Sequence, residues 1–366
     1  MTSVGRRQQV PTATKSDLLP PADAGGTGPT TAASRSRATL MIGLAVGLFL
    51  LLVVIVLSLG IGARTLSPGT VWSSLIHGGG DEADLIVRGL RVPRTIAGAL
   101  VGAALGLAGA LMQALTRNPL ADPGILGVNA GAACAIVLAI AFLGVTQLDQ
   151  YVWFALLGAA FATVVVYLLG STGRGGASPV RLVLAGAAVT AMLTGLISAV
   201  VLTNSIAFNG FRSWTVGSLQ HVDASVVAQV VPFLLVGFAL ATFLGPSLNT
   251  IALGDQLASA LGARVGRVRV AGIVATTLLC GAATAVTGPI AFVGLVVPHA
   301  VRAFTGPDYR WILPFSMIAG AILVLISDVI GRIVLWPSEL EVSVVTAIIG
   351  APVFIAIVRR RRLAEL

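Results

Sequence analysis

Charged residues are scarce in this chain of 366 residues. Only 10% of the residues are charged and 56% are hydrophobic, whereas a soluble domain carries about 25% charged residues. A soluble chain this apolar could not cover its surface with polar groups. Runs of roughly twenty apolar residues recur, each long enough to cross ~30 Å of hydrocarbon as a helix. These runs are continuous rather than alternating, which excludes a transmembrane barrel. We therefore expect an all-α polytopic membrane protein.

Lysine is almost missing, and its scarcity excludes a Walker-type ATP site. A P-loop needs Gly-x-x-x-x-Gly-Lys-Ser/Thr, because the lysine holds the phosphates. The only lysine, Lys15, is followed by Ser16 but preceded by Thr14. We therefore expect no enzymatic activity, no catalytic residue and no bound cofactor. Uphill transport would be driven by a partner ATPase or by an ion gradient.

Cysteine and histidine are also few. Cys134 and Cys280 lie inside apolar segments and form neither a disulfide framework nor a CxxC pattern. The histidines, His77, His221 and His299, are scattered and form no ligand pair at helical spacing. We expect no metal site.

The apolar runs predict about ten transmembrane helices. The expected spans are residues 40–63, 92–115, 124–145, 151–169, 180–203, 226–245, 268–288, 290–304, 311–335 and 342–358. If the N-terminus is cytoplasmic, the inner segments hold 17 of the 23 Lys and Arg residues and the outer segments hold six. Because basic residues concentrate on the cytoplasmic side, we expect both termini to be cytoplasmic. The net charge of +9 then reflects topology and not nucleic-acid binding.

The two ends of the chain differ from the expected transmembrane domain, residues 39–358. Residues 1–38 are rich in Pro, Gly, Thr, Ser and Ala and have no apolar periodicity. That composition predicts a disordered cytoplasmic tail. The first apolar run is long enough to span, so we interpret it as an uncleaved helix. Residues 359–366 are expected to form a basic cytoplasmic tail.

Two patterns concern packing and symmetry. Gly98, Gly102 and Gly106 recur at every fourth residue, a spacing that lets helices approach closely in lipid. The residues Pro119–Gly124 (Pro-Leu-Ala-x-x-Gly) recur as Pro289–Gly294 (Pro-Ile-Ala-x-x-Gly). In the expected topology the two copies lie at opposite membrane faces, as an inverted internal repeat requires.

Intramembrane carboxylates bear on the ion-coupled alternative. Such groups cost about 2.5–3.5 kcal/mol on insertion scales and mark proton or sodium relays. One strong candidate exists, Asp328, which precedes Arg332 by four residues and so shares its helix face. A structural ion pair is the favoured interpretation, and the secondary carrier stays as the alternative.

The longest inner connection, residues 246–268, predicts a short amphipathic helix. Leu253, Leu257 and Leu261 share one face, Asp255 opens the run and Gly262 ends it. From these residues alone, capping the bundle and docking on a partner are equally good explanations.

Hydroxyl side chains recur every fourth residue in the fifth span, at Thr190, Thr194 and Ser198. They share a face that should point toward protein or water, although each hydroxyl could also bond its own helix carbonyl. Met192 and Ile197 are expected on the opposite, protected face. The tenth span offers a weaker face at Ser343 and Thr346.

Several stretches resemble the FecCD-type permeases of ABC importers, which serve iron–siderophores, haem and cobalamin. The stretches are Arg91-Val-Pro-Arg94, Gly109-Ala-Leu-Met-Gln113, Arg117-Asn-Pro-Leu-Ala-Asp-Pro-Gly124, Gly288-Pro-Ile-Ala-Phe-Val-Gly-Leu-Val-Val-Pro-His299, Gly306-Pro-Asp308 and Thr346-Ala-Ile-Ile-Gly-Ala-Pro-Val-Phe354. The resemblance covers roughly residues 40 to 358. It implies a type II importer permease in the cell membrane that carries an iron–siderophore or similar metal chelate.

The resemblance also implies partners. These are a second permease subunit in a homo- or heterodimer, two cytoplasmic ATPase subunits that hold ATP and Mg, and an extracytoplasmic binding protein. The segment about 249–267 matches the ATPase-coupling segment, through residues Gly254, Asp255, Gln256, Leu257, Ala258, Ala260, Leu261 and Gly262. Arginines matching the binding-protein contacts are Arg91, Arg94 and Arg332.

The resemblance implies that the fifth and tenth helices line the translocation pathway. It thereby favours a pathway role for Thr190, Thr194 and Ser198 over carbonyl bonding. One stretch departs from the family, which has Glu-Leu-Pro-Val-Gly at the entry to the last helix. Here Glu341 and Ser343 replace the proline and the glycine, so the entry geometry is not carried over.

Overall fold

The computed structural model describes residues 36–62, 65–77, 80–172, 178–220 and 222–364. These residues are all-helical and include no β-strand. The predicted N-terminal tail lies almost wholly outside the described residues.

Each of the ten expected spans corresponds to one helix. In chain order they are α1 (Arg37–Gly60), α4 (Val92–Thr116), α5 (Val128–Leu143), α6 (Leu148–Ser171), α7 (Pro179–Thr203), α9 (Ala224–Ala252), α11 (Val265–Thr287), α12 (Val293–Thr305), α13 (Tyr309–Val334) and α14 (Val342–Ala364). Within the described residues, seven helices are long and apolar enough to cross a membrane, while α5, α12 and the apolar part of α14 are shorter.

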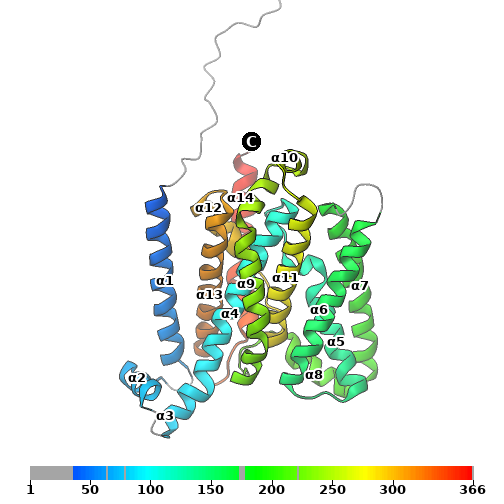
Figure 1. Ribbon diagram of the computed structural model, residues 1–366. Coiled ribbons are helices and arrows are strands. Elements are labelled where there is room, and N and C mark those ends of the chain that lie inside the picture. Colours follow the sequence, from blue (N-terminus) through cyan, green and yellow to red (C-terminus); the bar gives the residue numbers. More distant parts are fainter. Residues whose placement is uncertain (1–35, 63–64, 78–79, 173–177, 221, 365–366) are drawn as a thin grey trace, which may run out of the picture. The chain divides into compact units, whose positions relative to one another are not determined.

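Six short helical elements lie between the ten longer helices within the described residues. They are α2 (Pro68–Ile76), α3 (Glu82–Asp84), the π-helical η1 (Leu85–Arg91), the 3-10 turn η2 (Pro123–Leu126), α8 (Ser205–Thr215) and α10 (Asp255–Ala260). The start of α1, the end of α14 and α10 lie at one end, which we call the α10 end (Figure 1). The opposite end, with α2, α3 and α8, is the α2 end. The first and last of the ten longer helices therefore have their outer ends on the same side, as an even number of spans requires.

Helix α4 lies at the centre and packs on α13, α11, α12 and α9. Its most apolar window is 78% buried, whereas that of α1, which packs mainly on α13, is 11% buried. The surface of α1 is therefore free to face lipid. The helices α5 to α8 pack together on the side of α4 that lies away from α1 (Figure 1).

The glycine stripe of α4 is confirmed as a packing surface. A Cβ on Gly102 would overlap the carbonyl oxygen of Gly320 on α13, and one on Gly106 would overlap that of Ser316. The two backbones are thus in direct contact, which is how small residues bring helices together in lipid.

Several predicted boundaries are wrong by a few residues. Helix α5 begins at Val128, not at residue 124, because Gly127 has a φ of +73°. Helix α12 begins at Val293, not at residue 290, because Phe292 has a φ of +68°. A left-handed residue cannot continue a right-handed helix. Helix α9 continues to Ala252 through an internal proline, and α14 continues to Ala364, through the start of the predicted basic tail.

Candidate functional site

The two copies of the Pro-x-Ala-x-x-Gly motif lie beside one cavity. Its volume is about 840 Å³. The lining residues are Leu120, Asp122, Asn129, Pro289, Ile290, Ala291, Phe292, Leu295, Ser343, Val344, Ala347 and Ile348. Each copy is a non-helical segment that leads into a short helix, α5 or α12. Non-helical backbone at membrane depth is tolerated where it is buried in protein or lines a water-filled cavity, so the cavity accounts for both breaks.

The two copies also pack on one another, so the expectation that they lie at opposite membrane faces is wrong. An ideal Cβ on Gly294 would lie 2.9 Å from Cδ of Pro123. A Cβ on Gly109 would overlap the carbonyl of Gly294, and the Gln113 amide donates to the Leu295 carbonyl at 3.1 Å. The cavity thus lies where the repeats meet, the position at which transporters with inverted repeats bind substrate.

Two polar side chains in the cavity wall were missed by the sequence reasoning. Asp122 accepts a hydrogen bond from the Gly124 amide at 2.8 Å. The side-chain oxygen of Asn129 accepts from the Thr284 hydroxyl at 2.9 Å. The signal that could have found Asp122 was the motif echo, which we interpreted only as a sign of symmetry.

The predicted pathway residues of the tenth span behave differently from one another. Ser343 lines the cavity, and its hydroxyl donates to the Val216 carbonyl. Thr346 is fully buried, and its hydroxyl donates to the Ser343 carbonyl at 2.9 Å. Thr346 therefore makes the intrahelical bond that we weighed as the alternative to a pathway role.

The predicted pathway face of α7 is largely exposed on the single chain. Thr194 and Ser198 are exposed and Thr190 is half-buried. Ile197 is buried, as expected of a protected position, but Met192 is 64% exposed. Helix α7 thus packs on its neighbours along a narrow stripe, and the rest of its surface is available to a partner, lipid or water.

The predicted amphipathic helix between α9 and α11 is present as α10 but is shorter than expected. Gly254 with a φ of +106° precedes α10, and Gly262 with a φ of +84° follows it. Ala258 is fully buried, whereas Leu257 and Leu261 are 50% and 63% exposed. Leu253, at the end of α9, is also exposed. The remaining predicted residues, Gln256 and Ala260, are exposed too.

Asp255 ties α10 to the rest of the structure. Its carboxylate pairs with Arg117 at 3.4 Å and with Arg269 at 3.1 Å. Arg117 ends α4 in a left-handed conformation, with a φ of 52°, and lies two residues before the first motif copy. The acidic residue that was predicted only from the helix dipole therefore links α10 to both α4 and α11.

The predicted binding-protein arginines lie together at the α2 end. Arg91 donates to the carbonyls of Leu59 and Gly60 at 2.7 and 2.8 Å, and Arg332 donates to those of Ser58 and Ile61 at 2.8 and 3.0 Å. These are among the last carbonyls of α1, which lack helical partners and attract cations. Both arginines are buried, so each holds the end of α1 in place.

Arg94 forms the centre of an ion-pair network. It pairs with Asp328 at 2.7 Å and with Glu339 at 2.8 Å. Asp328 also pairs with Arg332, which confirms the predicted ion pair. Arg94 is thus a second partner of Asp328 that the sequence did not predict. The three arginines and Glu339 border a pocket of about 500 Å³. Glu339 is the most exposed member of the Arg94 ion pairs, at 21%.

A membrane-spanning helical chain with a cavity at the junction of two broken helices is a transporter permease in its architecture. The FecCD transport family model matches residues 50–360. The chain is 49% identical over 302 residues to the ferric enterobactin transport system permease protein FepD of Escherichia coli, covering 82% of this chain and 90% of that one. The chain belongs to the FecCD transport family.

A second relative and a solved structure agree with this assignment. The iron(3+)-hydroxamate import system permease protein FhuB of Bacillus subtilis is 39% identical over 304 residues, covering 82% of this chain and 79% of that one. A solved structure described as an inward-facing conformation of a metal-chelate type ABC transporter matches with a TM-score of 0.76 and 28% identity. That match covers 88% of this chain and 99% of the other.

Proposed function

We propose that this chain is the permease subunit of an ABC importer that carries an iron–siderophore complex or a similar metal chelate into the cytoplasm. The observation that carries the proposal is the cavity between the two motif copies in a FecCD chain. Its wall combines apolar side chains with the polar groups of Asp122, Asn129 and Ser343. A wide, weakly polar surface suits a large chelate, because tight ligands would block its release.

Partners supply the energy in this proposal. Two ATPase subunits hold ATP and Mg and dock at α10, where Leu257 and Leu261 expose an apolar face beside the buried Ala258. A second permease subunit packs against the exposed side of α7, so that Thr190, Thr194 and Ser198 face the pathway. The chain itself hydrolyses no ATP and binds no nucleic acid.

The proposed orientation places the α10 end and both termini in the cytoplasm, with the protein in the cell membrane. The excess of basic residues on that side supports it. A binding protein then docks at the α2 end, where Arg94 holds Glu339. An acidic residue of the binding protein can replace Glu339 on Arg94, since a planar guanidinium binds carboxylates in two places. Arg91 and Arg332 lie buried beneath that surface, where they line the same pocket.

The alternative, an ion-coupled carrier, needs a titrating carboxylate inside the membrane. Asp328 is a poor candidate because Arg94 donates to it through Nε and Nη2, at 3.1 and 2.7 Å, and Arg332 donates to it as well. Both guanidinium groups therefore occupy this carboxylate, which leaves it no free face toward a transported ion. The geometry therefore favours a structural role for Asp328.

Uptake measurements test the proposal. Cells with and without the intact gene are given iron-55 as a catecholate, a hydroxamate, a citrate complex and haem. Loss of one of these uptakes on deletion, with recovery from a plasmid copy, is expected. Recovery should fail when the partner ATPase carries a substituted P-loop lysine. Uptake that survives that substitution and collapses with a protonophore would establish the carrier instead.

A further inference from the structure

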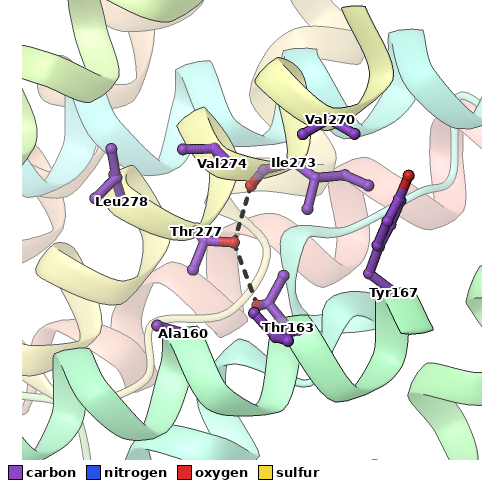
Figure 2. Close-up of a pocket in the computed structure, with 9 residues that line it drawn as sticks. Ala160, Thr163, Tyr167, Val270, Ile273, Val274, Thr277 and Leu278 are labelled. Carbon is purple, nitrogen blue, oxygen red and sulfur yellow. Dashed lines mark hydrogen bonds between the residues drawn. The ribbon is translucent and has the colours of Figure 1, made fainter. Parts of the chain in front are cut away.

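A groove between α6 and α11 has no part in the proposed transport cycle. Its volume is about 270 Å³, and it is lined by Ala160, Thr163, Val164, Tyr167, Val270, Ile273, Val274, Thr277 and Leu278 (Figure 2). The Thr277 hydroxyl donates to the Ile273 carbonyl at 2.9 Å and is hydrogen-bonded to the Thr163 hydroxyl at 3.2 Å. These hydroxyls are turned toward one another, so the groove presents an apolar surface.

The groove is closed toward the membrane centre and extends toward the α10 end. The helices touch beyond Leu278, where an ideal Cβ on Gly281 would lie 3.2 Å from Cβ of Ala159. Tyr167 and Val270 lie together at the opposite end of the groove (Figure 2). The eight steps along the helix from Val270 to Leu278 span about 12 Å at 1.5 Å per residue. One leaflet holds roughly 15 Å of hydrocarbon, so the groove has the length of an acyl chain in a single leaflet.

Positive charge stands at the open end of the groove. Arg267 is exposed and lies three residues before Val270, one turn nearer the end of α11 and on the same helix face. Arg264, at the start of that helix, is also exposed. Tyr167 has the amphipathic ring that is enriched where hydrocarbon meets headgroups. An apolar slot with an arginine at its mouth complements a lipid that has a phosphate above its acyl chain.

We propose that this groove binds one anionic phospholipid, with an acyl chain between α6 and α11 and the phosphate on Arg267. The proposal requires that the chain spans a membrane, and it rests on the proposed function only for placing that leaflet on the cytoplasmic side. Helix α11 directly follows α10 and its Arg269 pairs with Asp255. The lipid would therefore lie against the helix that carries the coupling segment.

Native mass spectrometry of the assembled complex, taken from phosphatidylcholine nanodiscs containing some phosphatidylglycerol, tests the site. Wild type should retain phosphatidylglycerol in preference to phosphatidylcholine. Arg267→Gln should weaken that retention about fivefold, whereas Arg37→Gln, at an exposed arginine of α1, should not. Val274→Trp should fill the groove and abolish retention. Its control is Val53→Trp on α1, because the two valines are similarly exposed, at 44% and 38%.

Three results would overturn the proposal. One is equal retention of the two lipids by wild type, and another is wild-type retention in either Arg267→Gln or Val274→Trp. The third is displacement of phosphatidylglycerol by excess inorganic phosphate, which would reduce the site to a surface anion site. Lipid retention is counted without any transport, so its failure and a failure of the uptake experiment are separate results.

Discussion

The substitution Asp328→Asn should destabilise the protein strongly, although it preserves the shape of the side chain. Asp328 is 1% exposed and accepts hydrogen bonds from Arg94 and Arg332. The substitution removes the negative charge between two cations that stay in place. Arg332 is itself only 3% exposed, so water cannot replace the missing carboxylate.

The expected magnitude follows from burial. Breaking a buried ion pair by removing one partner costs about 3–5 kcal/mol, because the other charge is left uncompensated. Glu339 still pairs with Arg94, so most of the cost falls on Arg332. We expect Asp328→Asn to lower the free energy of unfolding by about 3–5 kcal/mol. The double substitution Asp328→Leu with Arg332→Met should recover part of the loss, since it removes both charges.

The chain offers a matched control in Asp255. This carboxylate also pairs with two arginines, but its side chain is 41% exposed. Exposed ion pairs contribute about 0.2–1 kcal/mol, so Asp255→Asn should cost less than about 1 kcal/mol. Unfolding of the purified variants in detergent, followed by denaturant and by temperature, compares the two. A loss for Asp328→Asn no larger than that for Asp255→Asn would refute the reasoning from burial.

Three further outcomes are expected. Gly102→Leu should cost about 1–3 kcal/mol in the same unfolding assay, whereas Gly266→Leu, with open space at its Cβ, should cost little. Leu257→Asp should leave the chain in the membrane and lower uptake and ATPase stimulation at least about tenfold, since an acid in an apolar interface acts as a hot-spot loss; unchanged coupling would contradict the α10 assignment. Cysteine at Thr194 should react with a water-soluble thiol reagent faster than cysteine at Ile197, and equal rates would exclude this face from the pathway.

The number and order of the helices could be predicted from the sequence, because lipid requires long apolar segments and basic residues mark their ends. The starts of α5 and α12 could not. Residues 124–127 and 290–292 are all apolar or glycine, so composition extends the helices through them. The left-handed conformations of Gly127 and Phe292 break the helices there, and these depend on tertiary packing.

The contacts that Arg91 and Arg332 make with α1 also could not be predicted from local sequence patterns. Arg332 follows Asp328 by one helical turn, so that pair could be predicted from spacing alone. The carbonyls that Arg91 and Arg332 bind belong to α1, whose relevant residues lie 31 or more positions earlier in the chain. The family resemblance pointed to these arginines as outward-facing contacts, but Arg91 and Arg332 are buried and bind carbonyls at the end of α1.

The motif echo explains how α10 and the cavity are connected. Arg117, two residues before the first copy, pairs with Asp255 of α10, and the first copy lines the cavity through Asp122. The second copy follows α11, which α10 directly precedes, and it packs on the first copy where Gly294 meets Pro123. If a partner docks at α10, as we propose, a displacement of α10 would reach the cavity wall by two short routes, one through each copy. Because closely packed segments transmit strain, ATP hydrolysis by the proposed partner would then change the substrate cavity.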